Sequence, residues 1–485
     1  HLCVYLILYR LVYVCSCVLQ AARSSSLMAA TLPKLAAAVA VMVAVLACVV
    51  LSDQRVAVES LGVPKSLLSL VGEIDLAALL AHATAPENRL HTAQLAVVGA
   101  LALAALVYVA HQLFSPYERH RTLHEIQSCD ELSGMRGGIG GRSRKAGSLP
   151  PPYPNGWFKI MESRELALGE VKSAQFLGQH LVAFRGHSGR IMVLDAYCPH
   201  LGANLSAGGK VVGDSIVCPF HGWQFDGASG RCTSIPYSSR PVPEVARTRA
   251  WHVQECNKQV YLWFDAEGRA PTWHVQRSSE IDDEGYRYHG STSHEIQAHC
   301  QEMPENGADF AHLNFLHVPC AVSRLLSHVI LHRWFATWKP GKADDYYHAY
   351  LDLHQHMELF GFKLPGTYVH VDVTQEGPGL VFLRFQTPVG RLIVIETVTP
   401  IAPLLQSATH VVYASWWLPR FIGKFVLYGL VVQFERDMPI WNNKTFVPSP
   451  MVVEGDGPIA GFRRWYQAFY SESSAKFRGS NGPDW

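Results

Sequence analysis

The chain has 485 residues, of which 48% are hydrophobic and only 17% are charged. Together with its glycines, this apolar share exceeds what soluble domains usually contain, so we expect part of the chain to lie in a membrane. The 41 lysines and arginines nearly balance the 40 aspartates and glutamates, which excludes dedicated nucleic-acid binding, and the eleven cysteines are too irregularly spaced for a disulfide scaffold.

Two long apolar runs predict a membrane anchor region over residues 1–132. Residues 35–51 are uninterrupted apolar sequence, and residues 93–114 contain no Asp, Glu, Lys or Arg. Each run is about long enough for a spanning helix. A cleaved signal peptide is the alternative for the first run, and a buried core helix is the alternative for both. The first methionine is Met28, so the residues before it are either native or upstream translated sequence.

Basic residues follow the second apolar run and predict the orientation of the anchor. They are Arg119, Arg121, Arg136, Arg142, Arg144 and Lys145. Because the cytoplasmic flanks of membrane helices are enriched in Lys and Arg, we expect the rest of the chain to face the cytosol. The expected location is the membrane of the endoplasmic reticulum, and unpaired thiols suit its cytosolic face.

A flexible linker is expected over residues 133–156, which are rich in Gly, Ser and Pro. After it, short apolar runs separated by Gly and Asp predict an antiparallel β domain over residues 157–270. The clearest runs are residues 181–184, 191–194, 210–218 and 261–264.

Two Cys-Pro motifs inside this β domain predict a metal centre. Cys198 and His200 belong to the first, and Cys218 and His221 belong to the second. Two thiolates and two imidazoles suit a structural zinc ion. They also suit a 2Fe-2S cluster in which the two cysteines bind one iron and the two histidines bind the other. We favour the cluster, because each motif supplies one ligand of each kind and contains a glycine that permits a tight loop.

The segments CPHLGANLS and CPFHGWQFDGASGRC resemble the Rieske cluster motif. Rieske proteins of respiratory complexes have an additional cysteine in each loop and a serine after the second histidine, where this chain has Ala203, Phe220 and Trp223. Fewer hydrogen-bond donors to the sulfurs imply a lower reduction potential. The resemblance is therefore to Rieske domains that deliver electrons to an oxygenase.

A second iron centre is predicted within residues 271–485. Asn306, Asp309 and His312 recur at every third position, which predicts that they lie along one side of a helix. His317 lies five residues further, so the helix must end or widen before it if both imidazoles are to reach one metal. Two imidazoles and one carboxylate on one face of an iron leave positions open for O2 and substrate.

The spacing Asp-x-x-His-x-x-x-x-His resembles the mononuclear iron motif of Rieske oxygenases. The resemblance implies that His312 and His317 bind a non-haem Fe(II) ion. It also implies that Asp309 carries electrons between the two centres. From its place in the three-residue repeat, we expect Asn306 to lie beside the ligands.

The third iron ligand is expected far downstream. Residues 433–444 resemble the Q-x-x-x-D-x-x-I-W-x-x-K segment of steroid-acting Rieske oxygenases, and this match implies Asp437. Glu435 is the alternative, because the sequence does not show which carboxylate faces the metal. The apolar residues 421–434 predict a core helix beside the iron, with a hydrophobic substrate channel or membrane contact as a possible second role.

Most of the chain from about residue 35 resembles the Neverland-type cholesterol 7-desaturases, a family of Rieske oxygenases. The resemblance implies an α+β protein with N-terminal membrane helices, an antiparallel β Rieske domain and a helix-grip-like catalytic domain. It implies conversion of cholesterol to 7-dehydrocholesterol in steroid hormone synthesis, using O2 and electrons that a separate reductase takes from NAD(P)H. It also implies a homotrimer in which one subunit's cluster serves its neighbour's iron.

Three other functions remain open. A Rieske steroid hydroxylase would have the same site but an oxygenated product. A Rieske oxygenase could instead act on another hydrophobic substrate, such as a chlorophyll derivative. A non-enzymatic electron carrier would need the cluster but not His312, His317 or Asp437.

Overall fold

The computed structural model describes residues 104, 107–111, 113–122, 149–320, 327, 329–387 and 390–477. The chain divides into two compact units, His1–Phe114 and Ser115–Trp485. In the first unit, residues 107–111 and 113–114 are helical and largely exposed. The candidate span 35–51 lies outside the described residues, and so does most of 93–114. Within the described ranges, no helix is both long and apolar enough to cross a membrane.

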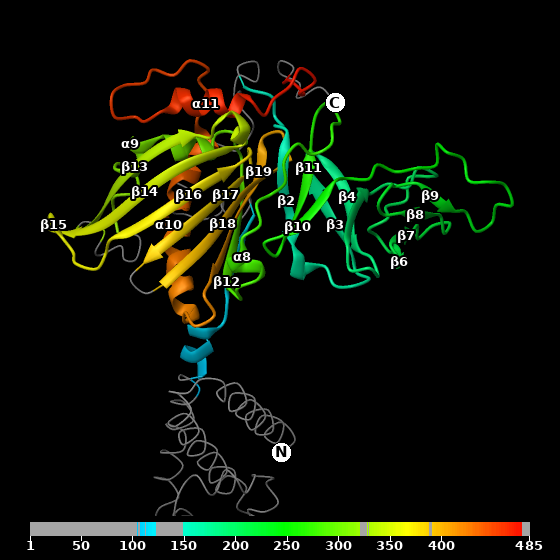
Figure 1. The fold of residues 1–485 in the computed structure, drawn as a ribbon, viewed down its shortest axis with the longest axis horizontal. Coiled ribbons are helices and arrows are strands. Elements are labelled where there is room, and N and C mark those ends of the chain that lie inside the picture. The colour runs from blue at the N-terminus through cyan, green and yellow to red at the C-terminus, as the bar shows by residue number, and fades with distance from the viewer. Residues whose placement is uncertain are drawn as a thin grey trace, which may run out of the picture. The chain divides into compact units, whose positions relative to one another are not determined.

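The N-terminal part of the second unit forms three small antiparallel sheets (Figure 1). The first contains β2 (Gly156–Glu162), β10 (Val253–Cys256) and β11 (Gln259–Phe264). The second contains β3 (Val171–Phe176), β4 (Gln179–Arg185) and β5 (Ile191–Asp195). The third contains β6 (Lys210–Val212), β7 (Ser215–Val217), β8 (Gln224–Asp226) and β9 (Cys232–Ser234). All four apolar runs expected in this region contain strands.

A nine-stranded sheet dominates the rest of the unit, in the order β1-β12-β19-β18-β17-β16-β14-β13, with β15 paired to β14. Only β1 runs parallel to its neighbour, β12; the other pairs are antiparallel. The strands are β1 (Tyr117–Arg121), β12 (Arg287–Ile296), β13 (Ile330–Pro340), β14 (His348–Leu359), β15 (Phe362–Lys363), β16 (Val369–Glu376), β17 (Leu380–Thr387), β18 (Gly390–Ala402) and β19 (Leu405–Ala414). The described part of this unit is therefore mostly β.

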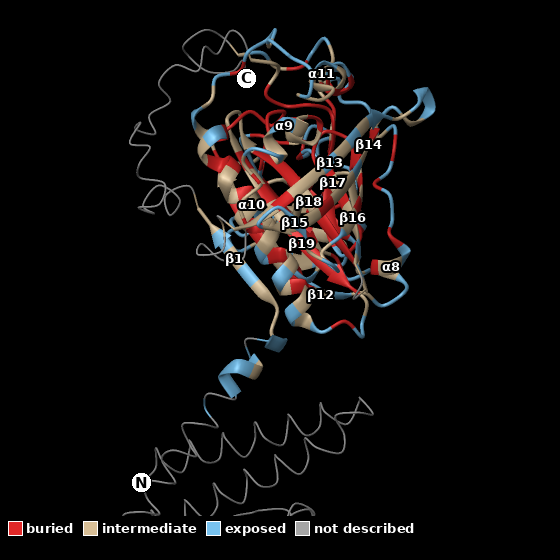
Figure 2. Ribbon diagram, turned by 90° about the vertical axis from the view of Figure 1, so that its left-hand side faces the viewer, coloured by how far each residue is buried: buried red, intermediate tan, exposed pale blue. Residues whose placement is uncertain are grey.

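One long helix, α10 (Arg420–Asn443), packs on β12 and β19 of this sheet (Figure 2). Its buried residues recur at intervals of three and four, which places them on one stripe facing the sheet: Gly423, Leu427, Val431, Phe434, Asp437, Met438 and Trp441. At Gly423, a Cβ atom would lie 2.3 Å from Nδ1 of His289 on β12, so the close approach of helix and sheet requires glycine there. The expected core helix over 421–434 is part of α10.

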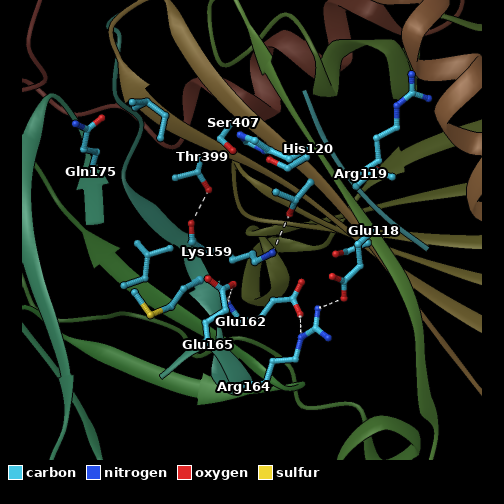
Figure 3. A pocket seen from close by; sticks show the side chains of 17 residues that line it. Glu118, Arg119, His120, Lys159, Glu162, Arg164, Glu165, Gln175, Thr399 and Ser407 are labelled. Carbon is cyan, nitrogen blue, oxygen red and sulfur yellow. Dashed lines mark hydrogen bonds and ion pairs between the residues drawn. The ribbon is translucent and has the colours of Figure 1, made fainter. Parts of the chain in front are cut away.

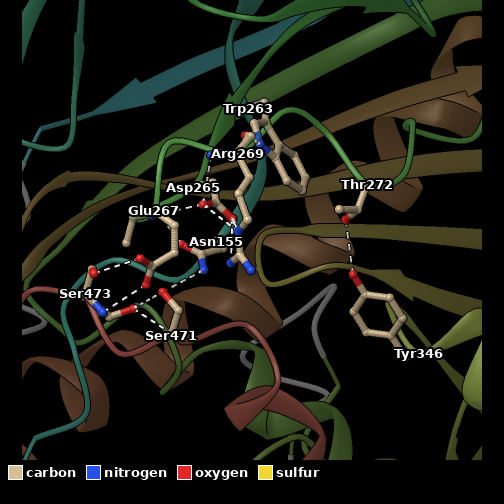
Figure 4. Close-up of polar contacts among 11 residues, drawn as sticks. Asn155, Trp263, Asp265, Glu267, Arg269, Thr272, Tyr346, Ser471 and Ser473 are labelled. Carbon is tan, nitrogen blue, oxygen red and sulfur yellow. Dashed lines mark hydrogen bonds and ion pairs between the residues drawn. The ribbon is translucent and has the colours of Figure 1, made fainter.

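Helix α11 (Ile459–Gln467) and the tail after it tie the two parts of the second unit together. Residues of α11 and β11 belong to one apolar cluster, which includes Phe462, Tyr466 and Trp263. In the tail, the Ser473 hydroxyl donates to Glu267 on the loop after β11, beside the Asp265–Arg269 ion pair (Figure 4). Pro152 to Gly156, at the end of the expected linker, are buried, and Gly156 begins β2.

Candidate active site

The two Cys-Pro motifs form matching loops in the β domain. In the first loop, the Gly202 N–H donates to the Cys198 carbonyl at 2.9 Å; in the second, the Gly222 N–H donates to the Cys218 carbonyl at 3.1 Å. Both glycines have φ of +73°, a left-handed conformation that favours glycine. Each loop therefore turns back on its own cysteine.

The loops present two buried thiols and two half-exposed imidazoles. Cys198 and Cys218 are each 3% exposed and are free rather than joined in a disulfide. The ring centroids of His200 and His221 lie 4.8 Å apart. Burial raises the pKa of the Cys198 thiol to about 11, so a metal that binds there must displace a proton. This set of two thiols and two converging imidazoles fits a 2Fe-2S group of the Rieske kind.

Trp223 is a contact of the first loop's imidazole that the sequence did not identify. Its ring stacks on His200 with centroids 4.7 Å apart and 6° between the planes, and its Nε1 donates to the Tyr237 hydroxyl at 2.8 Å. The stacking fixes the orientation of the His200 ring.

The segment from Asn306 to His312 is not the single helix that the three-residue spacing predicted. A 3-10 helix, η4 (Pro304–Ala308), ends before Asp309, whose backbone is extended with φ −98° and ψ +96°. The Asp309 carboxylate then caps the short helix α9 (Phe310–Leu313) by accepting from the His312 N–H. A capping aspartate interrupts the helix because its side chain satisfies a donor that a continuous helix would bond to a carbonyl.

The chain leaves α9 before His317, as the spacing required. Asn314 anchors this turn to β13: its side chain donates to the Trp334 carbonyl at 2.8 Å and accepts from the Trp334 N–H at 3.1 Å. Trp334 in turn donates through Nε1 to the His317 carbonyl at 3.2 Å. The strand thereby fixes the position of His317.

His312, His317 and Asp437 come together, with one ligand atom from each within 4.8 Å of the others. The two imidazole centroids are 5.0 Å apart, and Nε2 of His317 lies 3.2 Å from Oδ2 of Asp437. His317 and Asp437 are buried, while His312 is partly exposed. Two nitrogens and one carboxylate on one side of a shared space are the donor set of a non-haem Fe(II) site with open positions.

Gln433 supports this group and was not assigned a role from the sequence. Its Oε1 lies 2.9 Å from Nδ1 of His317, and its Nε2 donates to the His317 carbonyl at 3.3 Å. Arg436 donates to the same Oε1 at 2.7 Å and to the Pro319 carbonyl at 2.9 Å. Gln433 and Asp437 are four residues apart on α10, so they share a face of the helix, and this spacing was the available signal.

Glu435, the alternative third ligand, faces elsewhere. Its Oε1 lies 3.2 Å from Nε2 of His294 on β12, 3.3 Å from Nε of Arg121 and 3.7 Å from Nη1 of Arg119 on β1. Residues that are two positions apart on an α-helix, such as these, are separated by about 200° around its axis. The carboxylates of Glu435 and Asp437 therefore point in nearly opposite directions.

Asp309 contacts His312 without joining the group, and Asn306 precedes it on η4. Among the residues that the structure describes, the Asn306 side chain forms no hydrogen bond. Oδ1 of Asp309 is 3.7 Å from Nδ1 of His312, and the same imidazole nitrogen bonds the Asp309 backbone carbonyl. The bidentate Arg463–Glu305 ion pair, at 2.8 and 2.9 Å, connects η4 to α11 and holds this segment in place.

A cavity of about 790 Å³ lies elsewhere, between β1, β2 and the β12–β19–β18 part of the sheet (Figure 3). Charged residues line it, among them Lys159, Glu162 and Arg164. None of the candidate ligands belongs to its lining. A charged cavity away from both centres does not suit a hydrophobic substrate, so we assign it no part in the chemistry.

Comparisons with known proteins agree with both centres. Residues 156–255 match the Rieske [2Fe-2S] domain, and residues 262–470 match the 3-ketosteroid 9alpha-hydroxylase C-terminal domain. The cholesterol 7-desaturase nvd of Xenopus laevis is 42% identical over 354 residues, which are 71% of this chain and 78% of that protein. The cholesterol 7-desaturase nvd of Bombyx mori is 42% identical over 401 residues, covering 79% and 86%.

Among solved structures, Pseudomonas putida CBB5 NdmA with caffeine superposes with a TM-score of 0.49 at 17% identity, covering 64% of this chain and 89% of that one. The extent and identity of the matches to the curated relatives establish the family. The chain belongs to the Neverland-type cholesterol 7-desaturases, a family of Rieske oxygenases.

Proposed function

We propose that this protein introduces the 7,8 double bond into cholesterol, giving 7-dehydrocholesterol for steroid hormone synthesis. Cys198, His200, Cys218 and His221 hold the 2Fe-2S cluster, and His312, His317 and Asp437 hold a mononuclear Fe(II) ion. The observation that carries the proposal is the convergence of the last three side chains within 4.8 Å, in a chain that also carries paired Rieske loops. An electron carrier would have no use for that second group.

The reaction consumes O2 and reducing equivalents. Two hydrogens from C7 and C8 of the sterol, with two electrons and two further protons, reduce O2 to two molecules of water. The iron supplies the binding of O2 and its activation for hydrogen abstraction when it is bound. The chain itself holds the ligands: Gln433 orients His317 through its Nδ1, and the buried Asp437 supplies the negative charge.

One face of the sheet offers an apolar surface beside the iron residues. Strand alternation places Leu351, Leu353 and Met357 of β14 on the face that also carries His332 and Trp334 of β13. These apolar side chains are only half-buried, so they are available to a hydrophobic substrate. Among the described residues, Nε2 of His332 is buried without a hydrogen-bond partner, which makes it a polar group that a sterol could satisfy.

Electrons come, in this proposal, from NAD(P)H through a separate reductase, and the functional assembly is a homotrimer. Transfer between subunits requires both ends of the route to be accessible at the surface. The imidazoles of His200 and His221 are half-buried, and the Asp309 side chain is 34% exposed. These exposures support Asp309 as the residue through which electrons pass to the His312 iron site.

We also propose that the protein works at the membrane of the endoplasmic reticulum, facing the cytosol. Five exposed aromatic residues lie just before α10 or in its first three turns: Trp416, Trp417, Phe421, Phe425 and Tyr428. The last three follow a helical spacing and form one stripe. Aromatic side chains favour the membrane interface, where a sterol would enter. Phe425→Ser should weaken flotation of the protein with phosphatidylcholine vesicles, whereas Phe362→Ser, on exposed β15, should not.

Sterol profiling tests the proposal. Cells expressing the chain and supplied with cholesterol should produce a sterol two mass units lighter, and cells expressing Asp437→Ala should not. The electron route is tested with the isolated protein: the lighter sterol should form when purified reductase and NAD(P)H are both added, and not when either is left out. Formation of the lighter sterol by Asp437→Ala at the wild-type rate would refute the assigned iron ligand.

A steroid hydroxylase is the second candidate, because residues 262–470 match the C-terminal domain of 3-ketosteroid 9alpha-hydroxylase. Both reactions begin with the removal of one hydrogen atom from the sterol. Hydroxylation then adds an oxygen atom to the same carbon, whereas desaturation removes a second hydrogen atom from the neighbouring carbon. A product 16 mass units heavier than the substrate would identify the hydroxylase. The same mass-spectrometry experiment therefore decides between the two.

A further inference from the structure

A second group of histidines and carboxylates lies on the other face of β14 from the apolar residues Leu351 and Leu353. Asp352 and His354 of β14 stand directly opposite Asp372 and His370 of β16. Because side chains alternate along a strand, all four point to the same side of the sheet. We call these four residues the β14–β16 cluster.

The ligand atoms of the β14–β16 cluster are close enough to share one ion. Asp352, His354 and His370 each place a ligand atom within 4.8 Å of the others. Nε2 of His354 is 3.3 Å from Asp352 Oδ2, and Nε2 of His370 is 2.6 Å from Asp352 Oδ1 and 3.4 Å from Asp372 Oδ1. Ligands about 2.0–2.1 Å from a tetrahedral zinc ion are about 3.3 Å from one another, so the 2.6 Å contact between His370 and Asp352 must open to admit the ion.

Hydrogen bonds from outside the cluster orient its members. The two imidazole rings stack with centroids 4.6 Å apart and 8° between their planes, so one ring must turn about its side-chain bonds for both nitrogens to face one ion. Tyr368 Oη lies 2.8 Å from Nδ1 of His354, and Gln386 Nε2 donates to Asp372 Oδ2 at 2.8 Å. Metal-binding imidazoles are commonly held through their second nitrogen in this way.

One of the two tautomers of His354 favours a cation, whereas in the other Tyr368 donates to Nδ1 and the Nε2–H group bonds Asp352 directly. When Nδ1 donates to Tyr368, the lone pair of Nε2 faces the Asp352 carboxylate at 3.3 Å. Two electron-rich atoms at that separation repel unless a proton or a metal ion lies between them. Two carboxylates and two neutral imidazoles carry a charge of −2, which a divalent ion balances.

We propose that Asp352, His354 and His370 bind a divalent transition-metal ion of the zinc type, with Asp372 or water as the fourth ligand. Imidazole and carboxylate donors suit zinc. The side chains of the cluster are between 26% and 52% exposed, so an ion reaches them from solvent. The ion would tie β14 to β16 behind the apolar face that they present beside the iron residues. It is separate from the two iron centres and takes no part in the redox chemistry.

Zinc binding by the iron-loaded protein tests this proposal. The chain is equilibrated with micromolar ZnCl2 and dialysed, and zinc per chain is counted by elemental mass spectrometry. We expect His370→Ala and Asp352→Asn each to retain one zinc ion fewer than the wild type. His356→Ala is the matched control: His356 lies on the same strand and face as His354, but its Nε2 contacts Glu358 at 3.4 Å. It should retain the wild-type amount.

Two further measurements separate a metal site from an ion pair and from misfolding. Zn²⁺ should raise the thermal midpoint of the wild type and of His356→Ala, but not that of His370→Ala. Cu²⁺ bound in place of zinc should give an electron paramagnetic resonance signal with two coupled nitrogens, reduced to one in His370→Ala. Retention of the mononuclear iron, whose site depends on the completed sheet, reports folding of that sheet in every variant. Equal zinc retention by the wild type and both cluster variants would show that only a proton joins these side chains, and would overturn the proposal.

Discussion

The two metal centres of this protein are assembled over very different distances along the chain. All four Rieske residues lie between Cys198 and His221, in two loops that each fold back on their own cysteine. The mononuclear group combines His317 with α10, whose Gln433 is 116 residues away, and the strands from β13 to β19 lie between them. The first centre therefore depends on local turns, whereas the second depends on the completed sheet.

This contrast predicts that the second centre can be lost without the first. His317→Ala removes a buried ligand, so we expect no retained mononuclear iron and no detectable product. The Rieske loops make their bonds without His317, so the visible spectrum of the cluster should persist. Iron content, spectrum and sterol products are measured on the same preparation. Cys218→Ser is the reverse case and should abolish the spectrum. Joint loss of both iron signals in His317→Ala would contradict the independence of the two centres.

Gln433 provides a finer test of how the second centre depends on the completed sheet, because it contacts the ligand His317 and is not itself one of the iron ligands. Gln433→Ala should lower iron affinity or activity by about 10–100-fold, as is typical when the group that orients a ligand histidine is removed. Titration of the iron-free variant with Fe(II), followed by activity, measures the change. Gln433→Glu keeps an acceptor for Nδ1 and should recover part of the loss. Wild-type affinity in Gln433→Ala would mean that Trp334 and the turn after α9 suffice to hold His317.

The same contrast explains how much could be predicted from sequence. The cluster loops and the runs that became β4, β5 and β11 were predictable, because their residues make their defining contacts locally. The helix through Asn306 and His312 was predicted wrongly. A three-residue spacing occurs both in a continuous helix and in a segment whose helix ends and restarts at a capping aspartate, so the spacing does not distinguish the two. In addition, the Arg463–Glu305 pair that holds this segment joins residues 158 positions apart, which a local pattern does not reveal.

Acidification should lower the free energy of unfolding of the catalytic sheet, because the sheet contains a buried histidine, His289. Burial, reinforced by the Arg420 guanidinium, lowers the pKa of His289 to about 4. An unfolded histidine titrates near 6.5, so between pH 6.5 and 4 the unfolded chain takes up a proton that the folded chain does not. The contribution of this residue to stability is present above that window and is lost as the pH falls through it.

The expected size of this effect is roughly 2 kcal/mol between pH 7 and pH 5. Urea unfolding of the wild type and of His289→Gln at both pH values measures it, because the difference between the two proteins cancels every other titrating group. The variant should lose less stability than the wild type on acidification. Equal losses would show that His289 is protonated in the folded sheet against α10.

The smallest predicted effect concerns Glu435 and Asp437, the two carboxylates between which the sequence alone could not choose as the third iron ligand. Glu435 bonds His294 and the β1 arginines, while Asp437 meets His317, because the two side chains lie on opposite sides of α10. Glu435→Gln should therefore keep its iron and lower the free energy of unfolding by about 1–2 kcal/mol, the lower part of the range for hydrogen bonds to charged groups, because Glu435 is partly exposed. Asp437→Asn should do the reverse, losing iron with little effect on unfolding. Iron analysis and urea unfolding of both variants provide the test, and iron loss in Glu435→Gln alone would move the third ligand to the other face of the helix.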